Sequence, residues 1–530
     1  MKACRGDTVL RVPEVAKIHA HVEAGELCQD DELDYWNNGK KKGCPINLEM
    51  QAEAERRMHA NRFREFFAVL VFSVLLTGMS KGALSGERQE VDLIVLASYV
   101  VTMDAEQPII RNGAVAIDQG LVVAVDREDI LREQFVGREE IGGAGRVLLP
   151  GLINGHTHAA MTLFRGVADD LDLMTWLQNY IFPLEAKFVD PDFVRVGMQL
   201  ACWEMIQSGI TTFVDMYFYP DVGAQVVLDC GLRAVIAAPL IDFPSPGFEG
   251  WEDSFAEGLE FVKRWKGKSE RIMPALAPHA PYTVSPDHYL EVLAAAKELN
   301  IPITTHISED YAEIVDMRKR YGTTSVHHLD QLGVFDAPLI AAHVVWPEKS
   351  EIVILAAKKV GIIHNPASNL KTGAGISPVP EMLAAGVRIG LGTDGAASTN
   401  DLDLWKEMRL AALIHKGVNR DATLMPALTV LRMATLGGAE ALGLENKIGS
   451  ITPGKRADLI QVDIDTPRLM PLYDIVSHLI YAVEASDVVT TIVSGQVLMR
   501  EGEVLTLNAT EIKSAAAKIA RKIKADIAKK

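Results

Sequence analysis

The sequence predicts an α/β fold, a (β/α)8 barrel of the TIM type with a small β-sandwich beside it. Eight short apolar runs lie between residues 147 and 392, and a helix-like pattern follows each of them, as expected for this barrel. Shorter β-branched runs precede and follow this region, and they are typical of strands in a small sheet. A glycine-rich dinucleotide loop and a phosphate-binding loop are both missing after the first run, which argues against a nucleotide-cofactor fold.

The barrel strands are predicted from the apolar runs in chain order. Each run is bounded by turn residues and is short enough to be a strand buried on both faces. The predicted strands are Val147–Ile153, Thr211–Met216, Arg233–Leu240, Ile272–Ala277, Pro302–His306, Leu339–His343, Gly361–His364 and Val387–Gly392.

The flanking sandwich is expected to combine both ends of the catalytic region. Its predicted strands are Val91–Leu96, Gly113–Ile117, Leu121–Val125, Ala457–Val462 and Val488–Val497. We therefore predict a composite β-sandwich from residues 88–147 and 445–507, a barrel over 148–444, and an amphipathic C-terminal helix over 508–530.

Residues 1–87 form an atypical N-terminal extension. They are polar and charged up to about residue 60, and the apolar run Phe66–Leu76 follows a basic flank. This run is short for a transmembrane helix and resembles the apolar part of a secretory signal. Three interpretations stay open: a mis-assigned start ahead of an export signal, a short membrane anchor, or a buried helix.

Composition limits the partners and the compartment. The chain has 530 residues and a formal net charge of −17, which argues against general binding to nucleic acid or to anionic membranes. Its five cysteines show no disulfide framework, so a reducing compartment is expected. We expect a cytoplasmic homo-oligomer whose catalytic domain makes no stable membrane association, although the run Phe66–Leu76 leaves export or anchoring open.

Polar groups at the predicted strand ends indicate chemistry. The first run leads to His156 and His158, and residues two apart on a strand face the same side. Catalytic groups of this barrel lie at the C-terminal strand ends. A lone histidine there is usually a packing residue, but that explanation would have to hold at six of the eight ends. The later ends lead to His279, His306 with Glu309, His343, His364 and Asp394.

These residues suggest a metal centre. The imidazoles of His156, His158 and His306 and the carboxylate of Asp394 can hold one divalent ion, for which Zn²⁺ is expected and Fe²⁺ is an alternative. Such an ion lowers the pKa of a bound water. Glu309 could then shuttle protons, His343 could bind the nucleophile or a developing oxyanion, and Asp394 could also accept a proton. The segment around His279 has no lysine to bridge two metals, which favours one ion.

The stretch from about Val91 to Gly502 resembles the amidohydrolase superfamily. Within it, the chain is similar to the 5′-methylthioadenosine/S-adenosylhomocysteine deaminases, which are related to triazine chlorohydrolases. The segments that carry the resemblance are Pro150–His158, Met174–Gln178, Phe182–Glu185, Gly209–Tyr217, Pro278–Tyr282, His306–Glu309, His364–Lys371, Leu391–Ser398 and Pro453–Leu459.

The resemblance implies hydrolytic deamination of an adenine nucleoside at C6, with ammonia as the leaving group. It also implies that Glu185 holds the ribose hydroxyls, which suits a carboxylate because it accepts two hydrogen bonds. The side chains expected to contact the substrate are Trp176, Glu185, His279 and His306.

One departure from the family pattern bears on the substrate. Relatives that act on S-adenosylhomocysteine can carry arginines after the third strand, whereas Ala237–Glu249 contains none. A buried carboxylate without a cationic partner is unfavourable. We therefore expect methylthioadenosine, whose tail is apolar, to be preferred over S-adenosylhomocysteine.

Two other classes of function remain open on the sequence alone. The same activated water would serve a triazine chlorohydrolase or a deaminase of guanine, 8-oxoguanine or cytosine, and fold does not choose among them. A non-catalytic scaffold is the more remote alternative, because such proteins tend to lose the metal ligands that this chain retains.

Overall fold

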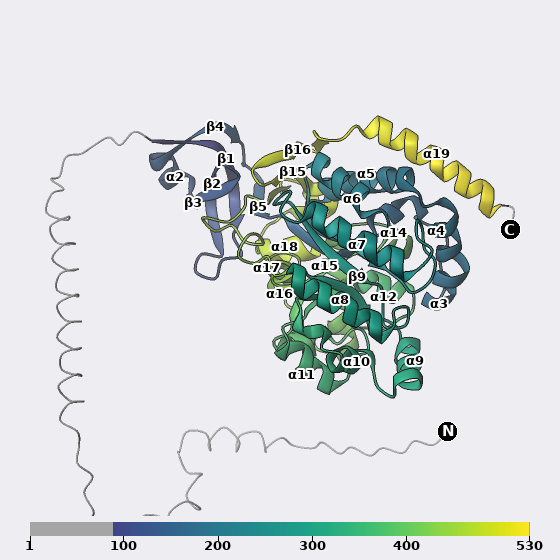
Figure 1. Ribbon diagram of the computed structural model, residues 1–530. Helices are drawn as coiled ribbons and strands as arrows, with labels where there is room; N and C mark the ends of the chain where they lie inside the picture. The colour runs from purple at the N-terminus through teal and green to yellow at the C-terminus, as the bar shows by residue number, and fades with distance from the viewer. Residues whose placement is uncertain (1–87, 529–530) are drawn as a thin grey trace, which may run out of the picture. The chain divides into compact units, whose positions relative to one another are not determined.

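Eight parallel strands close into a barrel with helices around it (Figure 1). The computed structural model describes residues 88–528, and the predictions made for residues 1–87 fall outside them. The (β/α)8 barrel predicted from the sequence is confirmed. Its strands are β6 (Leu152–Thr157), β7 (Ile210–Met216), β8 (Arg233–Leu240), β9 (Ile272–Pro278), β10 (Ile303–Ile307), β11 (Leu339–His343), β12 (Gly361–His364) and β13 (Arg388–Leu391).

The first predicted strand, Val147–Ile153, is wrong. Residues Arg146–Pro150 form β5, which pairs with strands of the flanking sheet, and the barrel strand β6 begins only at Leu152. Gly151 separates the two strands, and a side chain there would collide with Thr211, since an added Cβ would lie 2.1 Å from its Oγ1. The apolar run is continuous because both strands are buried, so hydrophobicity alone could not show the change of sheet.

The helices cover the barrel with their apolar faces. In α7, for example, the buried residues Trp251, Gly258, Phe261 and Trp265 recur at helical spacing, and the opposite face is charged. The longer helices around the barrel are α5 (Pro191–Ser208), α6 (Pro220–Cys230), α7 (Trp251–Trp265), α8 (Pro286–Leu299), α9 (Tyr311–Tyr321), α11 (Lys349–Ala357) and α15 (Leu404–Asn419).

Shorter helices fill the loops and the end of the barrel sequence. They are η2 (Ala159–Phe164), α3 (Leu173–Trp176), η3 (Leu177–Ile181), α4 (Phe182–Phe188), α10 (Ser325–Gln331), η4 (Val334–Asp336), α12 (Pro366–Lys371), α13 (Val379–Ala384), α14 (Ala396–Thr399), α16 (Ala427–Met433), α17 (Leu436–Leu442), η5 (Pro467–Leu469), α18 (Ile475–Tyr481) and η6 (Ala485–Asp487).

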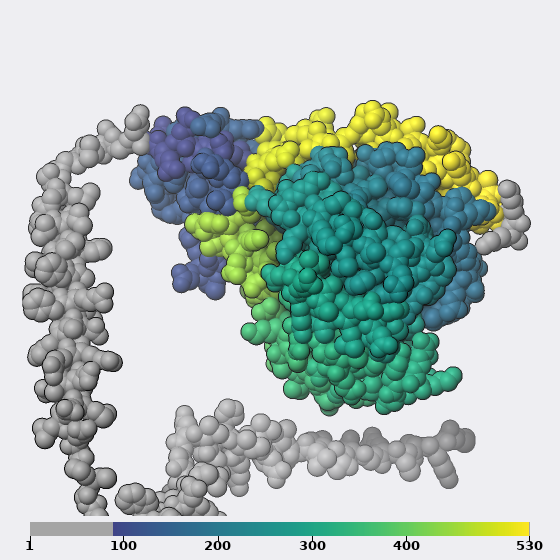
Figure 2. Space-filling view, in the orientation of Figure 1, coloured from purple at the N-terminus to yellow at the C-terminus, as the bar shows by residue number. Residues whose placement is uncertain are grey.

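A nine-stranded sheet flanks the barrel and combines both ends of the described chain, as predicted. Strand β14 joins the halves by pairing antiparallel with β5, and Figure 2 shows yellow C-terminal residues beside the purple N-terminal ones. Its strands are β1 (Gln89–Val101), β2 (Ile109–Asp118), β3 (Leu121–Arg127), β4 (Phe135–Ile141), β5 (Arg146–Pro150), β14 (Leu459–Asp463), β15 (Val488–Val493), β16 (Gln496–Arg500) and β17 (Glu503–Val504), with α2 (Glu128–Gln134) between β3 and β4.

Two further details complete the sheet and the C-terminus. The predicted strand Val488–Val497 is two strands, β15 and β16, because Ser494 and Gly495 both have positive φ and make a tight hairpin turn. Helix α19 (Ala509–Ile527) lies along α5 (Figure 1). Within residues 88–528, no helix is both long and apolar enough to cross a membrane.

Candidate active site

One pocket at the C-terminal ends of the barrel strands brings the predicted site residues together. Eight of the nine line this pocket, and the ninth, His156, is 1% exposed and lies against Asp394. By contrast, His364 at the end of β12 packs beside His415 of α15 and does not line the pocket. The eight lining residues are His158, Trp176, Glu185, His279, His306, Glu309, His343 and Asp394.

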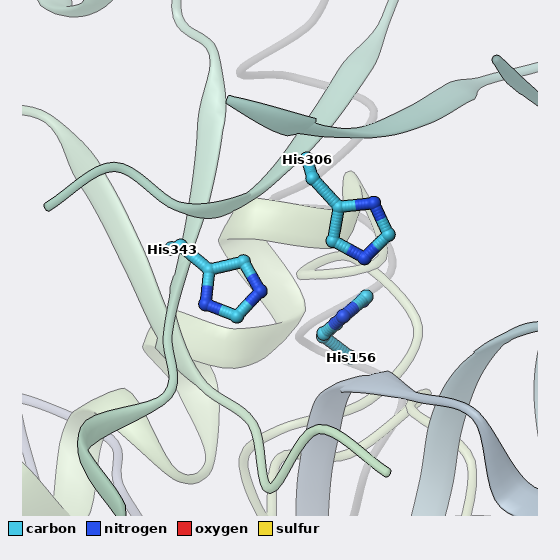
Figure 3. Close-up of side chains that lie close together, drawn as sticks. All are labelled: His156, His306 and His343. Carbon is cyan, nitrogen blue, oxygen red and sulfur yellow. The ribbon is translucent and has the colours of Figure 1, made fainter. Parts of the chain in front are cut away.

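Four histidines and one aspartate converge in the pocket. Potential ligand atoms of His156, His306 and His343 lie within 4.8 Å of one another, and so do those of His156, His158 and Asp394. Figure 3 shows the rings of the first group turned toward a common point. The two groups share His156, so the side chains come from four strand ends to one small volume. Every metal ligand predicted from the sequence belongs to one of these groups.

The hydrogen bonds of two histidines test whether a cation fits here. Nδ1 of His158 donates to the carbonyl of Met216 at 2.6 Å, and Nδ1 of His306 donates to the carbonyl of His279 at 2.7 Å. Both Nε2 atoms are then unprotonated, yet they face each other at 3.3 Å. Two lone pairs cannot hydrogen-bond to each other, and they repel unless a cation lies between them. This arrangement fits a metal ion held by Nε2 atoms, with carbonyls that fix each tautomer.

The remaining donors are equally suited to a cation. Both ring nitrogens of His156 are buried without a well-aligned hydrogen-bond partner among the described residues. Its Nε2 lies 3.4 Å from Oδ1 of Asp394, and Nε2 of His158 lies at the same distance from that oxygen. Burial lowers the pKa of His156 and of His306, so both imidazoles are neutral, as metal binding requires.

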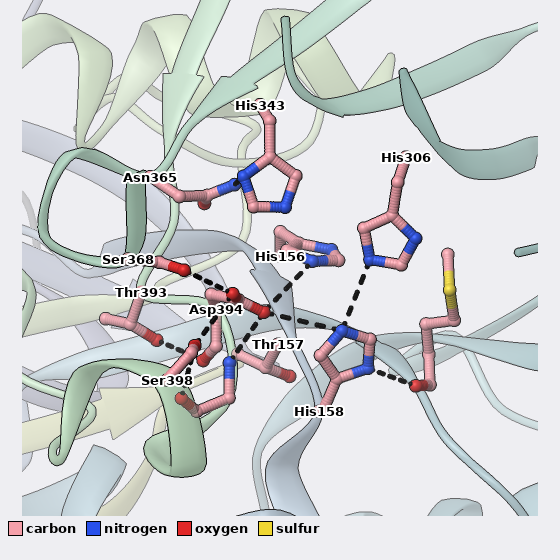
Figure 4. Close-up of polar contacts among 12 residues, drawn as sticks. His156, Thr157, His158, His306, His343, Asn365, Ser368, Thr393, Asp394 and Ser398 are labelled. Atoms are coloured by element: carbon pink, nitrogen blue, oxygen red, sulfur yellow. Dashed lines mark hydrogen bonds and ion pairs between the residues drawn. The ribbon is translucent and has the colours of Figure 1, made fainter. Parts of the chain in front are cut away.

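A network of donors fixes the Asp394 carboxylate (Figure 4). Its Oδ2 accepts hydrogen bonds from the hydroxyls of Ser368 at 2.6 Å and Ser398 at 2.8 Å, and its Oδ1 accepts the backbone N–H of Gly395 at 2.8 Å. Burial opposes ionisation of this carboxyl, whereas the hydrogen bonds that it accepts from Ser368, Ser398 and Gly395 favour the ionised form. The carboxylate is therefore ionised and oriented.

Glu309 and His343 form a second polar pair beside the metal donors. Oε1 of Glu309 lies 3.5 Å from Nε2 of His343, whose Nδ1 donates to Oδ1 of Asn369 at 2.8 Å. Burial raises the pKa of Glu309 well above its usual value, and the nearby Asp394 carboxylate raises it further. Burial lowers the pKa of His343 to about 4. The pair thus combines a carboxyl that readily holds a proton with a neutral imidazole, which suits proton transfer at neutral pH.

Three of the strand ends have unusual backbone geometry. Ser308, His343 and Asp394 adopt positive φ values of 51°, 74° and 62°. This left-handed conformation is unfavourable for residues with a side chain by about 1–3 kcal/mol each, and it persists only where the surroundings impose it. The strain turns the chain sharply at each strand end, which directs His343 and Asp394 into the pocket.

The opposite wall of the pocket is mainly apolar and comes from the segment after β6. Trp176 ends α3, a π-helical turn η3 follows, and Glu185 lies in α4. Glu185 is 4% exposed, and burial raises its pKa to about 8. His279, which follows β9, is held through Nδ1 by the hydroxyl of Thr283 at 3.0 Å. The pocket can therefore bind a largely apolar molecule that carries a few polar groups.

Sequence reasoning missed several residues of the site. Ser368 and Ser398 lie within segments that carried the family resemblance, but only the structure shows that they bind the Asp394 carboxylate. Tyr217 lines the pocket beside Glu185 and was not singled out either. Its position immediately after β7 was the available signal, since side chains at this point of a barrel strand face the site.

Comparison with known proteins supports this description. Residues 147–498 match the Amidohydrolase family model. A 5-methylthioadenosine/S-adenosylhomocysteine deaminase of Syntrophobacter fumaroxidans is 44% identical over 433 residues, which are 82% of this chain and 98% of that protein. A 5′-deoxyadenosine deaminase of Methanosarcina mazei is 43% identical over 437 residues, which are 82% of this chain and 99% of that protein.

A solved structure extends the comparison to the site. An adenosine deaminase from Xanthomonas campestris with bound zinc superposes with a TM-score of 0.81 at 38% identity, covering 83% of this chain and 100% of that one. Together with the donor set described above, these similarities assign a divalent metal to the cluster.

Proposed function

Because this chain belongs to the amidohydrolase family, we propose that it is a hydrolytic deaminase of adenine nucleosides. Water replaces the exocyclic amine at C6, and ammonia leaves. The observation that carries this proposal is one pocket that holds a metal donor set, the Glu309–His343 pair and the buried Glu185 together. The names of the relatives, methylthioadenosine/S-adenosylhomocysteine deaminase and 5′-deoxyadenosine deaminase, support it and disfavour triazine, guanine and cytosine as substrates.

The metal donors in this proposal are His156, His158, His306 and Asp394. Three imidazole nitrogens and one carboxylate suit Zn²⁺, and the zinc of the solved relative supports that choice. A divalent cation held there supplies a water of lowered pKa as the nucleophile.

The protein's own residues move the protons. The Glu309 carboxylate takes one proton from the attacking water and delivers it to the purine ring nitrogen next to C6, where it stays. The second proton of the same water then passes through Glu309 to the departing amine, so ammonia leaves and a carbonyl remains at C6. Its raised pKa makes it a competent acid once it has been protonated. Nε2 of His343, 3.5 Å from Glu309, holds the attacking oxygen in place as C6 becomes tetrahedral.

The substrate is held on the apolar wall. Glu185 accepts hydrogen bonds from the ribose hydroxyls, and these bonds favour its ionised form over the protonated form that burial favours. Trp176 and His279 pack along the nucleoside, and the His306 ring lies 4.7 Å from the His279 ring, so it also borders the bound molecule.

We also propose a cytoplasmic location and a homo-oligomeric state. The location is supported by the chemistry of the cysteines, since Cys202 and Cys230 are buried free thiols. Size-exclusion chromatography with light scattering would measure the oligomeric state.

A substrate panel tests the function directly. Zinc-loaded protein should release ammonia from methylthioadenosine, 5′-deoxyadenosine and adenosine, and it should release neither ammonia from guanine or cytosine nor chloride from a chlorotriazine. Faster turnover of any of these last three than of every adenine nucleoside would contradict the proposal. Protein that binds no metal and turns over none of the panel when Zn²⁺ is added would favour a scaffold.

The preferred 5′ substituent follows from a groove that continues from the pocket. The groove has a volume of about 500 Å³, and it shares Leu173, Leu177, Phe182 and Tyr282 with the pocket. Its basic residue is Arg320 of α9. That side chain is 49% exposed, and its Nε already binds Asp316 at 2.8 Å. An exposed, paired guanidinium contributes little to binding an anion.

We therefore predict that kcat/KM for methylthioadenosine exceeds that for S-adenosylhomocysteine by about tenfold or more, which corresponds to about 1.4 kcal/mol. Arg320→Ala should leave kcat/KM for methylthioadenosine unchanged and should lower that for S-adenosylhomocysteine by less than about fivefold. Steady-state kinetics with both substrates measures both effects. A tenfold preference for S-adenosylhomocysteine in the wild-type enzyme would be inconsistent with this account.

A further inference from the structure

Tyr217 places a hydroxyl group in the pocket, beside the Glu185 carboxyl. The residue follows β7 directly, is 3% exposed and lines the pocket, with its ring 6.4 Å from that of His158. Within residues 88–528, its hydroxyl has no well-aligned hydrogen-bond partner. A buried hydroxyl is unfavourable unless it is hydrogen-bonded, so a group in this state at a ligand-binding wall calls for a partner.

The immediate neighbour of this hydroxyl is the Glu185 carboxyl. Burial raises the pKa of Tyr217 well above its usual value, and the Glu185 carboxyl raises it further. The phenol is therefore protonated at any physiological pH and can donate a hydrogen bond. A donor and an acceptor thus lie side by side on a wall that is otherwise formed by Leu177, Ile181 and Phe182.

A sugar hydroxyl matches this pair of groups. Each ribose hydroxyl has one hydrogen to donate and an oxygen that accepts, so it can donate to Glu185 and accept from Tyr217 at once. A carboxylate alone would leave the hydroxyl oxygen without a donor. The apolar surroundings strengthen discrimination between substrates. A substrate that lacks the hydroxyl would leave Glu185 or Tyr217 without a hydrogen-bond partner, and no water would replace it.

We propose that Tyr217 is a specificity-determining residue that donates a hydrogen bond from its hydroxyl to one ribose hydroxyl of the nucleoside. This proposal rests on the proposed function and adds to it a second sugar-binding group. Glu185 accepts from both the 2′-hydroxyl and the 3′-hydroxyl, whereas Tyr217 donates to only one of them. The two hydroxyls therefore differ in their number of partners.

Three substrates and two variants test the proposal. The substrates are methylthioadenosine and its 2′-deoxy and 3′-deoxy analogues, and the variants are Tyr217→Phe and the control Tyr219→Phe. Tyr219 lies two residues further along the same segment, does not line the pocket, and loses the same hydroxyl group in its variant. Tyr217→Phe should raise KM for methylthioadenosine about tenfold and change kcat less than twofold.

The analogues separate a sugar contact from a general packing effect. One analogue should show the same KM with Tyr217→Phe as with the wild type, because the hydroxyl that Tyr217 binds is already missing, and the other should keep the tenfold difference. Equal effects on all three substrates, or no effect on any, would overturn the proposal. Wild-type protein that deaminates no adenine nucleoside would remove the proposed function and this inference together, whereas an active wild type with an indifferent Tyr217→Phe removes this inference alone.

Discussion

Glu309→Gln is expected to lower kcat by about a thousandfold or more while the protein keeps its metal and its fold. General acid–base catalysis contributes about 10²–10⁴-fold, and in the proposed mechanism one carboxyl both takes and delivers the proton. The glutamine amide has nearly the same shape, but it cannot accept a proton from water. Because the amide can occupy the position of the carboxyl, 3.5 Å from Nε2 of His343, the variant removes the proton carrier and leaves the geometry of the pair in place.

Thermal stability provides the control for Glu309→Gln. Burial raises the pKa of Glu309, which means that the folded protein disfavours its charge, so a neutral glutamine should leave the thermal midpoint unchanged or raise it. Glu313→Gln should behave differently. Its carboxylate accepts the backbone N–H groups of Ser308 at 2.8 Å and Glu309 at 2.9 Å, and an amide nitrogen would oppose one of them.

The two variants are therefore separable by measurement. Steady-state kinetics, thermal unfolding and metal analysis should show Glu309→Gln as inactive, stable and metal-bound, and Glu313→Gln as clearly less stable than the wild type. If Glu309→Gln kept kcat within tenfold of the wild-type value, Glu309 would not be the proton carrier.

Much of the fold could be predicted from the sequence because barrel strands are buried on both faces. Seven of the eight predicted strands match the observed ones to within a residue or two, since runs such as Arg233–Leu240 end at clear turn residues. The failure at Val147–Ile153 has the same origin. A run that is buried in two successive sheets carries no signal for the change of partner at Gly151.

Convergence of the site residues could also be predicted, because parallel strands present their C-terminal ends at one mouth. The detailed geometry could not. The positive φ values of Ser308, His343 and Asp394 depend on packing of the finished barrel, and local sequence does not encode them. Likewise, Ser368 reaches Asp394 only because the loops after β12 and β13 meet in space.

Arg320 shows the same limit for specificity. The segment after the third barrel strand, Ala237–Glu249, contains no arginine. The structure brings Arg320 of α9 to the groove from the part of the chain that follows the fifth strand. The groove therefore does contain an arginine. We still expect S-adenosylhomocysteine to be the poorer substrate, because this arginine is already paired with Asp316.

Asp394→Asn is expected to have the second very large effect, through the metal site. The carboxylate is the one negatively charged group among the predicted ligands, and it lies 3.4 Å from Nε2 of both His156 and His158. An amide removes that charge. Its NH₂ group would also face either Nε2 of these histidines or the hydroxyls of Ser368 and Ser398, which now donate to Oδ2. Activity should fall at least about a thousandfold, and bound metal should fall well below one ion per chain.

Ser398→Ala provides the graded comparison, because it keeps the carboxylate and removes one of the two hydroxyls that orient it. Loss of such an outer contact typically weakens metal affinity by about 10–100-fold, so this variant should bind zinc at high concentration and recover activity there. Metal analysis and the rise of thermal midpoint on zinc addition report binding without any assay of turnover. We expect a clear zinc-dependent rise for the wild type, a rise that needs more zinc for Ser398→Ala, and none for Asp394→Asn. Stoichiometric metal in Asp394→Asn would show that the histidines alone hold the ion, and Asp394 would then have to act on the proton of the nucleophile instead.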